Sequence, residues 1–378
     1  MLIGLLRIFP VLHSNAFIYR LSCVNLPKSF CYFSIIWYLC SAFRNKVRQR
    51  ANKYQNPRAW WQRKLSLLLL MLNSQFSTLT SFAQESQTAY NFLRLPVSAH
   101  VAALGGDNIT IVEDDATLIF HNPALINDVS DRTIGLNFMT YMEGSKTASA
   151  SFIKAAGERG SWGIAAQYMD YGTIKETTWD NTQLGDFSAR DISVAGSYAY
   201  ALSEQFSGGI TARLITSHIG SYNSLAVGVD LGVNYYLEDK ELSISAVAKN
   251  LGGQVKAYND DFEKIPFDLQ LGVSKRLLNS PLRFSATLTR LTDWSEGFGR
   301  HLCLGADVIL SPTIYLAAGY NFRRASEMKI SENDGSSAHG AGLSLGGGLQ
   351  LERFKLHVAY GKYHVSASSI LINISYAL

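Results

Sequence analysis

The sequence feature that most constrains the fold is an alternation of apolar and polar residues that recurs along most of the chain. It is clearest at the C-terminus, SSILINISYAL, where Ile370, Ile372 and Ile374 share one face and Asn373 and Ser375 share the other. A period of two residues is the side-chain period of a β-strand. The unbroken apolar face suits contact with lipid, whereas Asn and Ser suit a wet interior.

Fourteen segments show this alternation, and each is about ten residues long, a length that suits a tilted strand crossing a membrane. They begin near Thr133, Thr147, Trp162, Asp191, Phe206, Leu225, Glu241, Phe267, Leu282, Arg300, Thr313, Gly340, Phe354 and His364.

The connections between these segments alternate in length. Every second one is a short turn, such as GERGS or LSEQ, and the longest of the others cover residues 172–190, 250–266 and 323–339. Short turns on one side and long loops on the other are typical of bacterial outer-membrane barrels. We therefore predict an all-β fold, with a single antiparallel transmembrane β-barrel of about 14 strands over residues 132–378. A soluble β-sandwich also alternates, but it does not require this rhythm of turns and loops.

The N-terminal part of the chain has the features of a targeting sequence. Residues 63–83 combine the basic pair Arg63-Lys64, a Leu-rich apolar run and the small-x-small sequence Ser81-Phe82-Ala83, which together are typical of a secretory signal peptide. The mature protein is therefore expected to begin near Gln84. Since targeting signals normally lie at the true N-terminus, we interpret residues 1–62 as a non-native upstream extension. The alternative is a genuine extension with a short apolar segment at residues 30–40.

Charge and motif content exclude several function classes. Eleven of the 34 Lys and Arg residues precede Glu85, so the remaining 23 stand against all 30 Asp and Glu residues, a net charge of −7. A nucleic-acid partner needs a basic body, so none is expected. Only Cys303 follows the leader, and metal-site spacings and the catalytic motif HExxH do not occur. We predict no catalytic residue, no metal and no other cofactor.

The stretch EDDATLIFHNPAL stands between the leader and the first predicted strand. Asp114 and Asp115 are predicted to cap a short helix, since Asp is a favoured N-cap residue. Asn122 and Pro123 are predicted to start another, with Asn as the N-cap and Pro at the first helical position. Adjacent acids lack the alternate ligand spacing of a calcium loop. We predict that residues 84–131 form a short helical hatch inside or beneath the barrel mouth.

Three motifs resemble a known family. The combination of YNFLRLPVSAHVAALGG (Tyr90–Gly106), FHNPAL and fourteen strands resembles the FadL-like outer-membrane barrels, in which an N-terminal hatch fills the lumen. Within that group the chain, including IPFDLQLGVSKRL (Ile265–Leu277), is similar to the PorQ family of the type IX secretion system. The resemblance covers Tyr90–Leu378. The chain departs from most such barrels by ending in Leu378, not in an aromatic residue.

The resemblance to the PorQ family implies a non-enzymatic role in protein secretion and cell-surface anchoring. Such a barrel would sit in the outer-membrane lipid of a Gram-negative bacterium and hold a PorZ-like surface protein, beside PorU and PorV. Large aromatic residues in the long loops are the candidate docking residues, because aromatics dominate protein interfaces. They are Trp179, Tyr258, Phe262 and Trp294. Membership of an aromatic belt at the membrane interface is the other interpretation of these side chains.

The wider FadL-like group implies a second function, the transport of hydrophobic molecules across the outer membrane. That function requires a path through the lumen and a hatch that moves.

Overall fold

The computed structural model describes residues 88–142, 144–180, 182–294, 297–328, 330–332, 335–337, 340–364 and 367–378. The segments predicted as an upstream extension (1–62) and a signal peptide (63–83) lie outside the described residues.

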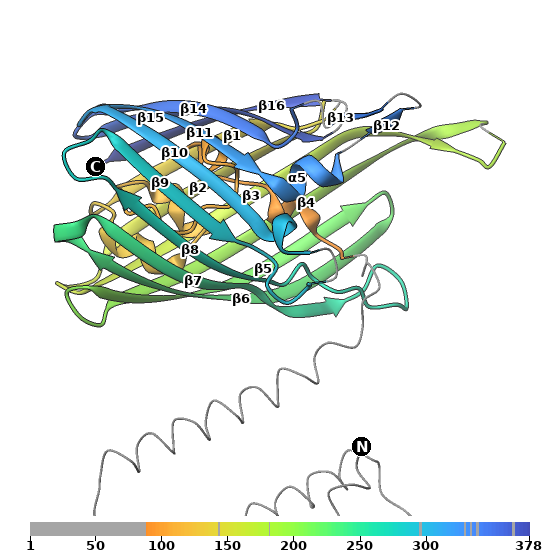
Figure 1. Cartoon of the computed structure of the whole chain (residues 1–378). Coiled ribbons are helices and arrows are strands. Elements are labelled where there is room, and N and C mark those ends of the chain that lie inside the picture. The colour runs from red at the N-terminus through yellow and green to blue at the C-terminus, as the bar shows by residue number, and fades with distance from the viewer. Residues whose placement is uncertain are drawn as a thin grey trace, which may run out of the picture. The chain divides into compact units, whose positions relative to one another are not determined.

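Fourteen antiparallel strands close into one barrel, which confirms the predicted fold class and strand number (Figure 1). The strands are β1 (Thr133–Thr140), β2 (Lys146–Ala155), β3 (Gly160–Thr177), β4 (Gln183–Ala201), β5 (Phe206–Ile219), β6 (Tyr222–Leu237), β7 (Leu242–Lys256), β8 (Asp268–Arg276), β9 (Leu282–Leu288), β10 (Leu302–Ser311), β11 (Ile314–Asn321), β14 (Leu343–Gln350), β15 (Phe354–His364) and β16 (Ala367–Ala377). Neighbours in the chain are neighbours in the barrel, and β1 pairs with β16 to close the ring. β12 (Ile330–Glu332) and β13 (Gly335–Ser337) form a separate two-stranded sheet.

The two faces of the barrel wall follow the alternation in the sequence. In β16 the side chains of Ile370, Ile372 and Ile374 are exposed on the outside, and those of Asn373 and Ser375 are buried inside. Exposed Leu, Ile, Val, Phe and Tyr side chains recur on the outer face of the other strands. A closed ring pairs its backbone groups internally, so this apolar surface can lie in the hydrocarbon of a membrane. No helix within the described residues is long and apolar enough to cross a membrane.

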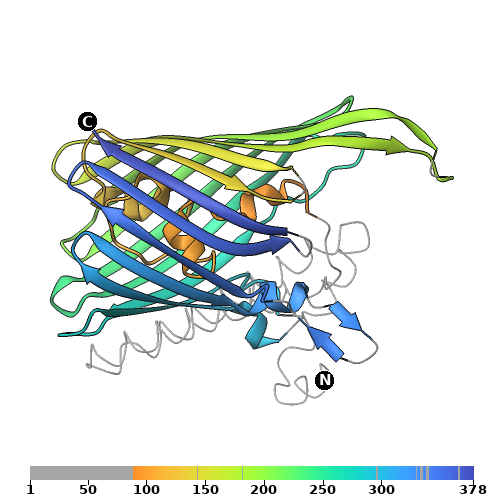
Figure 2. The same ribbon diagram turned by 90° about the horizontal axis from the view of Figure 1, so that it is seen from above.

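The prediction that residues 172–190 form a long loop is wrong. Residues 172–190 are mostly a continuation of β3 and β4, which stay paired from Thr173 opposite Ser188 to Thr177 opposite Gln183. This two-stranded ribbon projects beyond the barrel wall (Figures 1 and 2). Its Gly and charged residues are typical of a loop, but two strands that leave a sheet side by side can keep their cross-strand pairs. A short helix, α5 (Phe322–Glu327), lies at the same end of the barrel.

The residues before β1 lie inside the barrel as a hatch (Figure 2). They contain η3 (Asn91–Arg94), α4 (Ala99–Ala103), η4 (Ala116–Phe120) and η5 (Pro123–Asp128). At its start, Thr88 forms a β-bridge with Lys264 in the long connection between β7 and β8. The hatch then runs through the lumen to the opposite end, where β1 begins. The side chains of Ala99, Leu104, Leu118 and Leu125 are almost fully buried, so the hatch is the core of the protein.

Candidate functional site: the hatch in the barrel lumen

Two side chains cap the short helices of the hatch where the sequence places them. The Asp115 carboxylate accepts hydrogen bonds from the backbone N–H of Thr117 (2.9 Å) and from its hydroxyl (2.6 Å) at the start of η4. The Asn122 side-chain oxygen accepts from the backbone N–H of Ala124 (3.0 Å), and Pro123 occupies the first position of η5. Both helices are short 3₁₀ turns.

Asp114 has a different role from the predicted cap. Its carboxylate accepts hydrogen bonds from the backbone N–H (2.7 Å) and the hydroxyl (2.6 Å) of Ser130, and it pairs with the ammonium of Lys355 on β15. The Lys355 ammonium also donates to the Asp114 carbonyl oxygen (2.6 Å). Asp114 therefore joins the middle of the hatch to Ser130, near the start of β1, and to Lys355 in the barrel wall.

A buried group of charges around His100 also links the hatch to the wall. The two ring nitrogens of His100 lie 2.7 Å from a carboxylate oxygen of Glu113 and 2.8 Å from one of Asp307 on β10. Arg283 on β9 donates from Nε to the other Asp307 oxygen (2.7 Å). Neutral imidazole has one N–H only, whereas both His100 nitrogens face an acceptor. His100 is therefore the imidazolium, and two positive charges balance two carboxylates.

The pKa values of the two hatch residues agree with this charge state. Burial lowers the pKa of His100, but the Glu113 and Asp307 carboxylates outweigh burial and raise that pKa to about 9. Burial raises the pKa of Glu113, but the attraction of His100 outweighs it, so the Glu113 pKa lies below its ordinary value. The ring of Tyr315 stacks on His100 with a centroid distance of 3.9 Å.

A second histidine of the hatch is neutral and acts as an acceptor. The Nε2 atom of His121 accepts hydrogen bonds from the backbone N–H groups of Ser98 (3.1 Å) and Val97 (3.4 Å). Burial, followed by repulsion from Lys249 and Arg213, holds the His121 pKa well below its ordinary value. His121 therefore joins the FHNPAL motif to the start of α4, and this role accounts for the residue without any catalytic chemistry.

The barrel wall is shaped to receive the hatch by glycine residues that face the lumen. A Cβ atom added to Gly319 would lie 2.1 Å from the carbonyl carbon of Leu104, and one added to Gly209 would lie 2.4 Å from that of Pro123. Separations under 3.0 Å to backbone atoms leave no room for a side chain. Close contacts of an added Cβ with the backbone or side chains of the hatch occur on eight strands, at Gly135, Gly163, Gly209, Gly232, Gly272, Gly305, Gly319 and Gly346. We call these eight residues the glycine seats.

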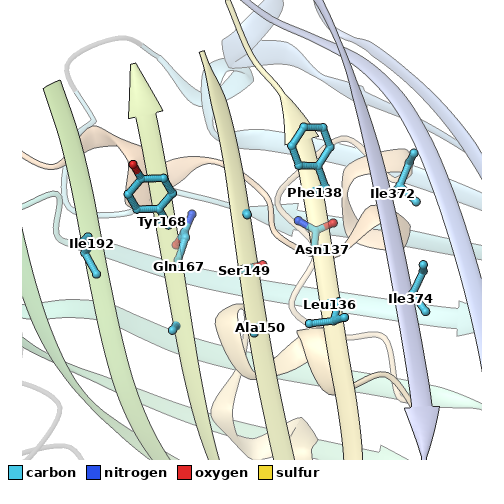
Figure 3. A pocket seen from close by; sticks show the side chains of 12 residues that line it. Leu136, Asn137, Phe138, Ser149, Ala150, Gln167, Tyr168, Ile192, Ile372 and Ile374 are labelled. Carbon is cyan, nitrogen blue, oxygen red and sulfur yellow. The ribbon is translucent and has the colours of Figure 1, made fainter. Parts of the chain in front are cut away.

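An apolar groove of about 440 Å³ lies on the opposite, lipid-facing side of the wall (Figure 3). It forms where the small side chains of Ala148, Ala150 and Ala166 leave space between larger neighbours. The larger residues are Leu136, Phe138, Tyr168, Ile192, Ile372 and Ile374. Because β1, β2 and β3 stay in continuous register here, the paired backbone separates this groove from the lumen.

The four predicted docking residues have different surroundings. Trp179 lies at the tip of the β3–β4 ribbon and is 98% exposed, and Phe262 is 67% exposed. Trp294 is half exposed, and the centroid of its ring lies 4.5 Å from the centroid of the His301 ring. Tyr258 is partly buried beside Tyr90 of the hatch, with ring centroids 6.3 Å apart. The structure thus leaves Trp179 and Phe262 as the most open aromatics of the set and makes Tyr258 part of the hatch contact.

The charged group around His100 is absent from the sequence-based site residues. His100 and Asp307 are 207 positions apart, so no local spacing pairs them. The only sequence signal was the position of both residues on otherwise apolar or small-residue stretches. Within the described residues, no group of three or more His, Cys, Asp and Glu side chains is placed to hold a metal ion.

Two solved structures with a similar fold are described as a transporter and a channel. The toluene transporter TodX of Pseudomonas putida has a TM-score of 0.50 and 15% identity, over 75% of this chain and 98% of that chain. A TodX deltaS2S3 mutant, described as a monoaromatic hydrocarbon channel, has a TM-score of 0.50 and 14% identity, over 74% and 98%. No protein-family model and no curated protein sequence matches the chain. At these identities the likeness concerns the fold alone, and it agrees with the resemblance to FadL-like barrels.

Proposed function

We propose that this protein is an outer-membrane barrel of a Gram-negative bacterium that carries a small hydrophobic compound across that membrane. The observation that supports it most is the likeness to the toluene transporter over 98% of that chain's length. The apolar outer wall and the internal hatch are consistent with this role. The wider FadL-like resemblance implies the same function.

The hatch is then the gate of the barrel. Its atoms reach the glycine seats around the ring, and its charges pair with Asp307 of β10 and Lys355 of β15. A cargo molecule passes only if part of the hatch leaves the wall. Fixing the hatch to the wall should therefore stop transport without disturbing the barrel.

A reversible disulfide tests this gate. An added Cβ at Gly135 of β1 lies 3.1 Å from the Cβ of Ala116 in η4. Disulfide-linked Cβ atoms are ~3.5–4.5 Å apart, so a small shift suffices to join cysteines at these two positions. The variant combines Ala116→Cys and Gly135→Cys with Cys303→Ala, which removes the native thiol. Each single cysteine variant is the matched control.

The measurement is the initial uptake of labelled toluene by intact cells. We expect uptake to fall to the level of cells without the barrel when the disulfide is formed, and to recover after treatment with dithiothreitol. The single cysteine variants should take up toluene equally in both states. Equal uptake by the oxidised and reduced double variant would contradict gating by the hatch.

Surface anchoring in the type IX secretion system is the second candidate function, and the β3–β4 ribbon is the observation that favours it. The ribbon carries a fully open aromatic, Trp179, beyond the barrel wall. Exposed aromatic side chains are typical anchors of protein interfaces. The partner under this proposal is a PorZ-like surface protein, with PorU and PorV in the same complex.

Deletion of residues 173–188 separates the two functions, because the remaining barrel keeps its register and its hatch. If the protein anchors a surface partner, cells with the deletion variant should lose that partner although they still contain the heat-modifiable barrel. The single variant Trp179→Ala should then weaken retention of the partner. For transport, the deletion should leave toluene uptake unchanged. Retention of the partner by the deletion variant would rule out the ribbon as its docking site.

A further inference from the structure

Four polar side chains form a row across four neighbouring strands on the inner face of the wall. Asn373 of β16 lies opposite His357 of β15 on one side and opposite Asn137 of β1 on the other. Asn137 in turn lies opposite Ser149 of β2. Figure 3 shows Asn137 and Ser149 at the same level, with Gln167 of β3 beside them. We call His357, Asn373, Asn137 and Ser149 the polar row.

Each member of the polar row has a buried polar atom without a partner. The atoms are His357 Nε2, Asn373 Oδ1, Asn137 Oδ1 and Ser149 Oγ, and none has a hydrogen-bond partner within the described part of the chain. None of the four residues is more than 9% exposed. Buried polar groups are normally paired, because an unpaired one has lost its hydrogen bonds to water. Four such atoms in adjacent strands are an exception that needs a physical reason.

Other polar side chains on the inner wall are paired with one another. Ser197 and Thr211 lie 2.6 Å apart, and the Asn234 side-chain oxygen accepts from Ser243 (2.8 Å) and Ser245 (2.7 Å). The absence of partners is therefore not general among the lumen residues that the structure describes. Unpaired buried atoms also occur on β5 (Arg213 Nε and Ser217 Oγ) and on β8 (Gln270 Oε1), but the polar row places them side by side on four adjacent strands, β15, β16, β1 and β2.

The hatch covers this sector with apolar side chains. Next to the polar row, Met139 of β1 and Leu371 of β16 belong to one apolar cluster with Leu118 of η4 and Ala99 of α4. The glycine seat on β1, Gly135, meets the side chains of Ala116 and Thr117 in the hatch and that of Ser151 on β2. On β5 and β11, by contrast, the glycine seats meet the hatch backbone itself. The hatch also has polar links to this sector, from Asp114 to Lys355 on β15 and from Asp115 to Ser375 on β16.

We propose that the polar row lines the passage that opens when η4 leaves the wall, and that the cargo is an amphipathic aromatic compound. This inference rests on the proposed transport function. One side of the open passage would carry the amide, imidazole and hydroxyl groups of the polar row, and the other would carry the apolar side chains of the hatch. A compound with a hydrocarbon body and one hydrogen-bonding group matches both sides, whereas toluene matches only the apolar one.

The test compares two compounds that differ by one hydroxyl group, 4-methylphenol and toluene. Initial uptake is measured in intact cells that produce the wild-type barrel, the double variant Asn137→Leu with Asn373→Leu, or no barrel. We expect the wild type to raise the uptake of 4-methylphenol at least tenfold more than that of toluene. The double variant should lose this preference while its toluene uptake stays the same. Ser197→Ala removes a paired lumen hydroxyl and should keep the wild-type preference.

Two further results decide the inference. Asn373 Nδ2 donates to the Leu136 carbonyl oxygen, so the stability test uses the single variant Asn137→Leu, whose band should convert at a temperature no lower than that of the wild type. A clear drop in that temperature would show that the Asn137 oxygen has a partner in the closed state and would overturn the inference. An unchanged preference in the folded double variant would overturn it too, and transport itself would stand. Uptake of both compounds at the level of cells without the barrel would overturn the transport function and the inference with it.

Discussion

At the scale of single residues, His100 is the side chain on which the closed hatch most depends. Among the described residues, it is the only cation with an ion pair to both Glu113 of the hatch and Asp307 of the wall. His100→Gln would remove one of the two positive charges that balance these buried carboxylates and would leave Arg283. Breaking a buried ion pair by removing one partner costs about 3–5 kcal/mol. We expect a loss of that size in the free energy of unfolding, measured by urea titration in detergent. A loss below 1 kcal/mol would contradict the charge balance described above.

The same residue predicts how stability depends on pH. The His100 pKa in the folded protein, about 9, is above that of unfolded histidine, roughly 6.5. A group whose pKa is raised by folding stabilises the protein fully below its unfolded pKa, and this contribution disappears as the pH rises through the folded pKa. The wild type should therefore lose stability between pH 7 and pH 10. His100→Gln should lose less over the same interval, and an equal slope in both proteins would exclude His100 as the titrating group.

Asn122 makes a smaller and local contribution. Its side-chain oxygen caps η5 through the backbone N–H of Ala124. Asn122→Ala should cost about 0.5–2 kcal/mol through the lost cap. Asn127→Ala, a substitution in the same helix that removes no cap, serves as the control. Equal stability of the two variants would show that the cap contributes nothing.

At the scale of elements, the hatch and the wall fit because glycine occupies the contact positions. Gly319→Val would put a side chain where the backbone of Leu104 and Gly105 lies, so the hatch cannot take its place. We expect a barrel that still shows heat-modifiable mobility but has a higher conductance in planar bilayers than the wild type. Gly196→Val is the matched control on β4, where no described atom lies within 4 Å of the added Cβ. Wild-type conductance of the Gly319→Val protein would contradict a hatch seated on glycine.

At the scale of the whole molecule, the hatch starts at one end of the barrel and ends at the other. Thr88 is bridged to Lys264 at the end that carries the long connections, and β1 begins at the opposite end. Before the hatch, the basic pair, the apolar run and the small-x-small sequence predict cleavage by a signal peptidase. We therefore expect the mature protein to begin near Gln84. N-terminal sequencing of outer-membrane material measures this, and peptides from Cys23–Cys40 in that material would contradict it.

The sequence by itself determined the features that depend on neighbours along the chain. Alternation decides which side chains face lipid, so the fold class, the strand number and the outer face of β16 could all be predicted from it. Capping is equally local, and Asp115 and Asn122 occupy their predicted positions. The sequence places the ends of β3 and β4 too early, because the Gly and charged residues that follow are typical of a loop. Such residues do not by themselves stop two strands from pairing.

Only the tertiary structure decided which distant residues meet. Barrel closure sets the register of all fourteen strands at once, and that register brings Asp307 to His100 and Asn373 to Asn137. The same closure makes Gly319 a seat for the hatch, although its sequence context is that of any strand glycine. A period of two shows that a side chain faces inward, but it contains no information about what lies opposite. The partner across the lumen depends on how the whole ring closes around the hatch.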